Sequence, residues 1–209
     1  MNYTTSALKM NIVPQDFYRR TTTEVAIGIL GMLLIRQVGD NIMAGRIVEC
    51  EAYLPNNDAA AHTYGRKPSV RTRVLFGEPG YAYVYSIHRY HCLNIVTEEI
   101  GRPGCVLIRA VEPIEGENLM LTNRHVSKRE SLTNGPGKLC QALQITSYMN
   151  GMNFTDPQSP IRIVRCVEGN AGFIVGNTSR IGVQQSKDLL LRFCIENSGF
   201  LSRPCTCSN

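Results

Sequence analysis

The stretch that decides the fold of this chain is RIVECEAY, residues 46–53, which is followed by a polar loop containing His62. Apolar residues flank its polar ones in a pattern that predicts a strand. Glu49, Glu51 and Tyr53 are spaced two residues apart, so they share one face of that strand. We predict that this face and His62 form half of an active site. An exposed strand edge or solvated face is the alternative for the two acids.

The composition is that of a single globular domain. The chain has 209 residues, 43% of them hydrophobic, and no composition shift divides it. No apolar run approaches the roughly 20 residues that span a bilayer, and the polar start lacks a signal-peptide core. We therefore expect a cytoplasmic protein with no membrane partner, forming one domain over residues 1–209. Residues 1–13 and 198–209 are expected to be flexible tails.

The eight cysteines do not predict a disulfide framework, which is typical of small secreted domains. Six lie singly in apolar patterns and are expected to be mostly buried thiols. For Cys205 and Cys207, a Cys-x-Cys near the chain end, a mobile tail is favoured over metal binding. The His-x-Glu and Pro-Cys-x-x-Cys motifs of a zinc deaminase are absent. We predict neither a metal nor a cofactor.

Periodicity predicts both strands and helices. Thr21 to Glu24 fits a capping box, and apolar residues from Val25 to Leu34 recur at near-helical spacing, so a helix is expected from about Thr22. Further helices are expected from beyond Pro113 to about residue 125 and after residues 134–137. The expected strands are 42–54, 81–87, 91–97, 105–111, 161–167, 172–175, 181–183 and 189–195. Strands in clusters with helices between them predict an α+β fold with a mainly antiparallel, curved sheet flanked by helices.

Positive charge is concentrated in two segments of a chain whose net charge is +5. Residues 65–91 carry a net charge of +4 and residues 124–138 a net charge of +3, so the remainder is slightly acidic. Such clusters indicate a polyanionic partner. Two solvated basic loops are the alternative, and charge alone leaves both open.

Further chemistry lies in later segments of the sequence. Tyr81, Tyr83 and Tyr85 share one strand face, and Arg109 interrupts the apolar run CVLIRAV. An unpaired cation would be costly to bury, so a carboxylate is its expected partner. A purely structural arginine–glutamate pair is favoured by spacing alone. Residues 134–138, NGPGK, open a helix that is either a phosphate site or a plain helix start.

Several motifs follow one another in order along the chain: RIVECEAYL (46–54) with His62, YVY (83–85), HCLN (91–94), VLIRAVEP (106–113), GPGKLCQAL (135–143) and RIGV (180–183). Together they resemble the alkyladenine (3-methyladenine) DNA glycosylase family, from about Asp16 to Phe193.

The resemblance implies a monomeric, monofunctional glycosylase of base excision repair. It would flip damaged purines out of duplex DNA and hydrolyse their N-glycosidic bond without lyase chemistry. Alkylated purines are the expected substrates, and deaminated purines are further candidates. Glu51 matches the general base, Arg109 a residue that holds the attacking water, and Ile181 a third contact through its backbone carbonyl.

The resemblance also implies roles in recognition. Tyr53, His62 and Tyr85 match the walls of the base pocket, and Asn94 matches a residue that excludes guanine by crowding its 2-amino group. The expected DNA contacts are Arg71, Arg73, Ile87, His88, Arg89 and Lys138.

The chain also departs from the family pattern. Residues 83–92, YVYSIHRYHC, are one residue shorter than the family's run, so Ile87, His88 or Arg89 is the candidate for the wedge that fills the gap in the duplex. The chain after RIGV is shorter too and lacks a tryptophan often found there. A non-catalytic reader of DNA damage is therefore the first rival interpretation. An unrelated small-molecule enzyme or structural protein is the second.

Overall fold

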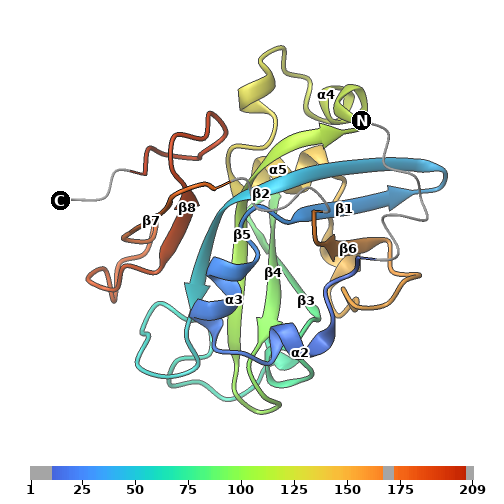
Figure 1. Ribbon diagram of the computed structural model, residues 1–209. Coiled ribbons are helices and arrows are strands. Elements are labelled where there is room, and N and C mark those ends of the chain that lie inside the picture. Colours follow the sequence, from blue (N-terminus) through green and yellow to red (C-terminus); the bar gives the residue numbers. More distant parts are fainter. Residues whose placement is uncertain (1–10, 167–171, 206–209) are drawn as a thin grey trace.

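The computed structural model describes residues 11–166 and 172–205 (Figure 1). The helices are α2 (Gln15–Tyr18), α3 (Thr22–Gly28), α4 (Glu117–Arg124) and α5 (Pro136–Ala142), with short 3-10 helices η1 (Arg73–Phe76), η2 (Arg129–Ser131) and η3 (Ser147–Met149). The strands are β1 (Leu33–Val38), β2 (Asn41–Tyr53), β3 (Ala82–Ile87), β4 (Tyr90–Thr97), β5 (Gly104–Glu115), β6 (Ile161–Val164), β7 (Val175–Thr178) and β8 (Arg192–Ile195).

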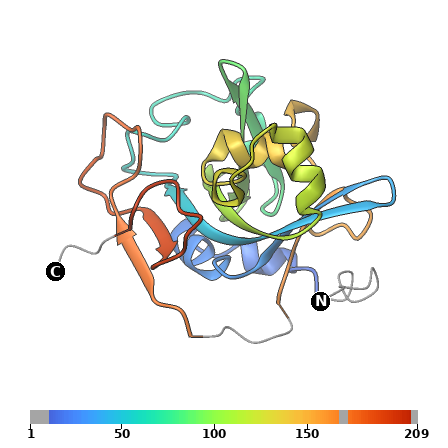
Figure 2. The ribbon, with the colours of Figure 1, turned by 90° about the horizontal axis from the view of Figure 1, so that it is seen from above.

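The eight strands of the described residues belong to one antiparallel sheet. Its main path runs β3-β4-β5-β2-β1-β6, and β8 pairs with both β2 and β7. Seen from above, the long β2 ribbon bends between α4 and α5 on one side and α2 and α3 on the other (Figure 2). The predicted α+β class and the single curved antiparallel sheet are confirmed.

The first long helix begins where the sequence predicts and ends sooner. Thr21 and Glu24 form the capping box, with Thr21 Oγ1 accepting from the Glu24 amide and Glu24 Oε2 from the Thr21 amide. The helix stops at Gly28, and Gly31 adopts a positive φ of 81°, which a glycine tolerates without strain. The expected helical continuation to Leu34 is wrong, because Leu33 and Leu34 pair with β2 and β6 instead.

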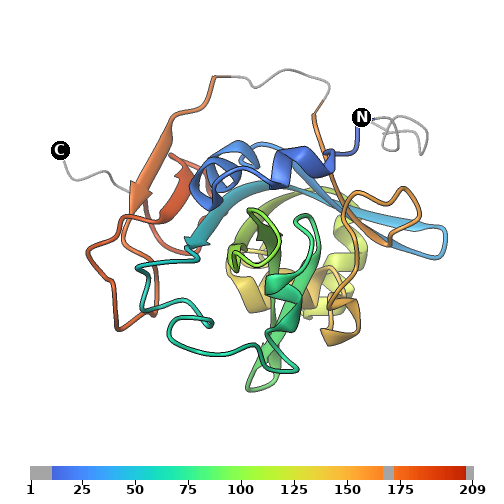
Figure 3. The same ribbon diagram turned by 90° about the horizontal axis from the view of Figure 1, so that it is seen from below.

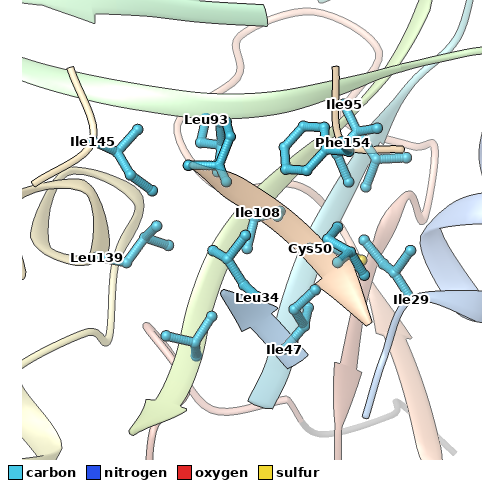
Figure 4. Close-up of a cluster of buried hydrophobic side chains, with 14 of the residues drawn as sticks. Ile29, Leu34, Ile47, Cys50, Leu93, Ile95, Ile108, Leu139, Ile145 and Phe154 are labelled. Atoms are coloured by element: carbon cyan, nitrogen blue, oxygen red, sulfur yellow. The ribbon is translucent and has the colours of Figure 1, made fainter. Parts of the chain in front are cut away.

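The main core joins residues from every layer. Side chains from α3, the central strands and α5 meet in one buried cluster (Figure 4). The residues labelled there are Ile29, Leu34, Ile47, Cys50, Leu93, Ile95, Ile108, Leu139, Ile145 and Phe154. Each Å² of apolar surface buried in this core contributes about 25 cal/mol to the free energy of unfolding, and this burial holds the helices on both sides against the sheet.

The pairing of β2 with β5 is irregular where the chemistry lies. Ile47 pairs with Val111, Glu49 with Ala110 and Cys50 with Ile108, so Val48 and Arg109 fall outside the one-to-one register. Bulges of this kind redirect side chains and are frequent beside active sites. Arg109 lies at this irregularity and reaches the carboxylates of both Glu49 and Glu51.

The late part of the chain differs most from prediction. Residues 181–183 form a loop rather than a strand, and β7 begins at Val175 instead of residue 172. The expected strand end at Val167 lies outside the described residues. The chain ends are packed rather than loose where they are described, since Val13 is fully buried and Phe200 is buried against Val48 and Ala110.

The cysteines also require a correction. Cys194 on β8 and Cys205 form a disulfide, so neither is a free thiol and Cys205 is buried rather than part of a mobile tail. Cys50, Cys92, Cys105 and Cys140 are buried free thiols, as predicted. Cys207 lies outside the described residues.

None of the helices in the described residues has both the length and the apolar character needed to cross a membrane. No cluster of three or more metal-ligating side chains occurs in that part of the chain.

Candidate active site

Glu51 is fully buried, and three groups contact its carboxylate. Tyr53 on the same strand donates its hydroxyl to Oε2 at 2.9 Å, and the backbone N–H of Ile181 donates to Oε1 at 2.7 Å. Arg109 on β5 adds an ion pair, with Nη1 at 3.3 Å from Oε1. The structure thus brings Glu51, Arg109 and Ile181 together across three distant parts of the chain. Ile181 contacts the carboxylate through its amide, and the contact predicted for its carbonyl stays a prediction.

Glu49 is buried beside this group rather than exposed at an edge. Its Oε1 accepts from Arg109 Nε and Arg192 Nε, each at 2.9 Å. Ser202 donates its amide to Oε2 and its hydroxyl to Oε1, each at 2.6 Å. Burial opposes ionisation, but the hydrogen bonds from Arg192 and Ser202 and the charge of Arg109 outweigh it and lower the pKa of Glu49. Glu49 is therefore an anion at neutral pH.

Arg109 is shared between the two carboxylates. Burial alone would lower its pKa, yet the charges of Glu51 and Glu49 more than compensate and raise it. The sequence predicted a carboxylate partner for this arginine, and the structure supplies two. Together with Arg192, which also donates to Glu49, Arg109 completes a buried group of two cations and two anions.

A pocket of about 420 Å³ opens directly beside these residues. Tyr53, His62 and Tyr85 line it together with Tyr83, so the residues predicted as pocket walls do share one cavity. The His62 ring stands edge-on to Tyr85 at 4.6 Å between centroids, and its Nδ1 lies 3.0 Å from the Tyr83 hydroxyl. The remaining lining residues are Ala59, Ala60, Ala61, Thr63, Leu75, Ile87, Cys92, Asn94, Pro103, Cys105, Leu107, Arg109, Pro136, Ile181, Gly182, Val183, Gln184 and Gln185.

Glu51 itself does not line this pocket. Its exposed fraction is 0%, but the three residues that contact its carboxylate, Tyr53, Arg109 and Ile181, all do. The acid is thus one side-chain layer behind the pocket wall. An aromatic cavity with a buried acid–arginine group behind it suits a planar substrate and an acid–base reaction.

The pocket is nearly free of titrating groups at neutral pH. Burial, then the charges of Arg71 and Arg66, lower the pKa of His62, so the imidazole is neutral there. Burial raises the pKa of Cys92 and raises that of Cys105 to about 12, so both remain thiols and neither is a nucleophile.

Asn94 lines the pocket in a fixed orientation. Its side-chain amide donates to the Tyr83 carbonyl oxygen at 3.0 Å, and only 2% of the residue is exposed. The side-chain oxygen of Asn94 lies 3.9 Å from Cys105 Sγ. An amide held in this way presents a rigid polar edge to whatever enters the pocket.

A buried ion pair joins two of the loops that form the pocket. Arg180 donates to both oxygens of Asp58, at 2.6 and 2.7 Å, and to the Ala52 carbonyl at 2.9 Å. Its guanidinium also lies 4.6 Å from the centroid of the Tyr53 ring. The pair therefore fixes the loop that carries His62 to the loop that carries Ile181.

The predicted DNA contacts divide into two groups. Arg71 lies 4.9 Å over the Tyr85 ring, Ile87 lines the pocket, and His88 and Arg89 form the turn of the β3–β4 hairpin. Arg73 begins η1, which also carries the pocket residue Leu75. Lys138 on α5 instead donates to Oδ1 of Asn134, which precedes that helix. Figure 3 shows the loop after β2 and the β3–β4 hairpin on the same side of the molecule.

Within the described residues, the two basic segments also differ from each other. Arg66, Lys67 and Arg73 are exposed and form no ion pair. In the second segment, Arg124 is bound to the Leu132 carbonyl and to Gln141, and Arg129 to Glu117 and the Pro113 carbonyl. Lys128 in the second segment is likewise exposed and in no ion pair among the described residues, so the first segment holds more of the uncommitted positive charge but not all of it.

Sequence reasoning assigned no role to four of these residues: Asp58, Arg180, Arg192 and Ser202. Arg192 carries the same signal that drew attention to Arg109, a lone arginine in an apolar strand pattern. Ser202 carries no such signal, because its contact with Glu49 depends on a segment expected to be loose.

The fold and the site together place a buried carboxylate behind the wall of a pocket lined by aromatic side chains. The family model for methylpurine-DNA glycosylase matches residues 16–199, so the chain belongs to that family. It is accordingly a hydrolase of N-glycosyl bonds of the DNA glycosylase class.

Curated relatives of this chain carry names that agree with the family. Proteins named, as a provisional assignment, 3-methyladenine DNA glycosylase match from Oceanobacillus iheyensis, at 42% identity over 90% of this chain and 94% of the relative, and from Koribacter versatilis, at 44% identity over 91% and 92%. One from Methanocella arvoryzae is 51% identical over 68% of this chain and 72% of the relative.

Proposed function

We propose that the protein is a monomeric, monofunctional DNA glycosylase that flips alkylated purines, 3-methyladenine among them, out of duplex DNA and hydrolyses their N-glycosidic bond. One observation carries the proposal: the carboxylate of Glu51 contacts Tyr53, Arg109 and Ile181, and all three line the aromatic pocket. The family membership and the names of the relatives support the class of substrate.

Glu51 acts as general base in this proposal. Water entering between Arg109 and Ile181 gives a proton to the carboxylate and attacks C1′, and the glycosidic electron pair leaves with the base. The carboxylate also stabilises the positive charge that develops on the sugar. Tyr53 and the Ile181 amide hold the two carboxylate oxygens in place for both tasks.

The pocket selects the base by stacking and by shape. A purine alkylated at N3 or N7 carries positive charge, and the electron-rich faces of Tyr53 and Tyr85 attract it. His62, neutral in the pocket, is positioned to hydrogen-bond with the stacked ring. Asn94, held by the Tyr83 carbonyl, excludes a guanine 2-amino group by its fixed position.

The surface around the pocket mouth binds the duplex. Arg71, Arg73 and Arg89 neutralise phosphates, with Lys138 as a further contact. Ile87 and His88 fill the gap left by the flipped nucleotide. Flipping requires a few kcal/mol, and least for damaged or mispaired bases, which adds to selectivity.

Replacement of Glu51 by Gln tests the mechanism. The amide keeps the size of the side chain but cannot accept the proton, so we expect base release from 3-methyladenine duplexes to be lost while binding to abasic-site DNA is retained. The measurement is abasic-site formation at saturating protein, with Glu115→Gln on β5, outside the pocket, as the matched control. Undiminished base release by Glu51→Gln would refute the role of Glu51.

A second candidate function is a non-catalytic reader of damaged DNA. The observation that favours it is the short β3–β4 turn, in which only His88 and Arg89 separate the strands. A panel of duplexes with modified purines decides between the two. Tight binding to a lesion without any base release over long single-turnover reactions would establish the reader.

A further inference from the structure

The C-terminal segment, residues 198–205, is built into the sheet beside the candidate active site. Phe200 is buried against Val48 and Ala110, and Arg192 donates to the carbonyl oxygens of Arg203 and Pro204 at 2.6 and 3.3 Å. The disulfide from Cys205 to β8 closes the segment. These three attachments bring Ser202 to the buried carboxylate of Glu49.

Ser202 contacts both members of the Glu49–Arg109 pair. Its hydroxyl donates to Glu49 Oε1 at 2.6 Å and accepts from Arg109 Nη2 at 3.4 Å, while its amide donates to Glu49 Oε2. Both carboxylate oxygens of Glu49 are thus occupied, and its rotamer is fixed. Arg109 in turn is bound to Glu49 by Nε at 2.9 Å.

The two carboxylates compete for the same guanidinium. Arg109 lies 2.9 Å from Glu49 but 3.3 Å from Glu51, so the hydrogen bond goes to Glu49 and Glu51 receives only the looser ion pair. If Glu49 released Arg109, the guanidinium would be free to pair in bidentate fashion with Glu51, the strongest geometry available to it. A carboxylate paired in that way is less available to accept a proton from water.

We propose that Glu49 and Ser202 are positioning residues that keep Arg109 from closing onto Glu51. The inference rests on the proposed glycosylase function, because it assigns the use of that site. Neither residue touches the pocket, so each acts through Arg109 rather than on the substrate. The C-terminal segment thereby becomes part of the catalytic apparatus and not only of the fold.

The test compares two serine replacements in the same segment. Ser202→Ala removes the hydroxyl contacts to Glu49 and Arg109 but keeps the hydrogen bond from the backbone N–H of residue 202 to Glu49 Oε2. Ser198→Ala is the matched control, because the Ser198 hydroxyl accepts only from the Phe200 amide within the segment. Base release from a 3-methyladenine duplex is measured in single turnover over a range of protein concentrations, and melting temperatures are recorded for every variant.

We expect Ser202→Ala to lower the maximal rate constant about tenfold, the effect of one hydrogen bond to a charged group, with half-saturation changed less than about twofold. Ser202→Thr should restore most of the rate, since it returns the hydroxyl. Glu49→Gln should lower the rate constant further, by about 100-fold, with DNA binding retained.

Two outcomes overturn the inference while leaving the glycosylase function in place. One is a Ser202→Ala rate equal to that of Ser198→Ala. The other is a loss of rate and DNA binding together, alongside a lowered melting temperature and without rescue by Thr, which would make the contacts structural only. A wild-type protein that releases no base from any duplex overturns the proposed function and this inference with it.

Discussion

At the scale of single residues, His62 makes the pocket sensitive to acid. Its pKa in the folded protein lies below 6.5 because burial and then the charges of Arg71 and Arg66 disfavour the imidazolium. The unfolded chain therefore binds a proton that the folded chain does not as the pH falls through this range. Stability should decrease as the pH is lowered from about 7.5 to about 5.5.

The prediction is that His62→Asn loses less of its free energy of unfolding across this pH interval than the wild type does. Urea denaturation at both pH values measures it. His125→Asn is the control, because His125 is exposed and has a φ of 52° that asparagine tolerates. Identical pH dependence in His62→Asn and in the wild type would contradict the prediction.

At the scale of elements, the Asp58–Arg180 pair connects two loops that the sheet alone does not hold. Both side chains are fully buried, so removing one partner leaves an uncompensated charge. We expect Asp58→Ala to reduce the free energy of unfolding by about 3–5 kcal/mol. Glu117→Ala breaks the exposed pair with Arg129 and should change it by less than about 1 kcal/mol. Chemical denaturation of the two variants gives the comparison, and equal effects would show that burial does not matter here.

The elements that the sequence predicted well are those with local signals. The capping box at Thr21 and the strand around Glu51 are set by neighbouring residues, and both are found within about one residue of prediction. The segment from Leu33 was wrongly assigned to a helix because its apolar pattern fits either structure, and only pairing with β2 and β6 decides it. The disulfide of Cys205 could not be predicted because spacing does not reveal which cysteines meet.

At the scale of the whole molecule, charge determines how the protein meets DNA. Arg73 is exposed, unpaired among the described residues, and close in sequence to the pocket residue Leu75. DNA affinity should fall steeply with salt, and Arg73→Ala should reduce the slope of log K against log salt by about 1. Arg124→Ala, whose guanidinium is engaged within the protein, should leave the slope unchanged. Fluorescence anisotropy over a salt series measures both slopes, and a flat wild-type profile would contradict the prediction.

Part of the site depends on contacts between residues far apart in the chain, which the sequence could not show. Resemblance to the family pointed to Glu51, Arg109 and Tyr85, and the structure places Arg109 and Tyr85 in the wall of one cavity, with Glu51 in contact with Arg109 behind that wall. The partners of Glu49 lie on β8 and in the C-terminal segment, 143 and 153 residues further along the chain. Contacts of such separation leave no local pattern, so only the three-dimensional structure shows them.

The contact between Glu49 and Ser202 has a consequence for biosynthesis. It spans 153 residues, so a chain growing on the ribosome cannot form it until Ser202 has been made. The central strands and their helices precede that residue, so they can assemble before the group of charges around Arg109 is complete. A prematurely terminated chain that ends before Ser202 would therefore fold in large part yet lack the contact on which we propose its chemistry depends.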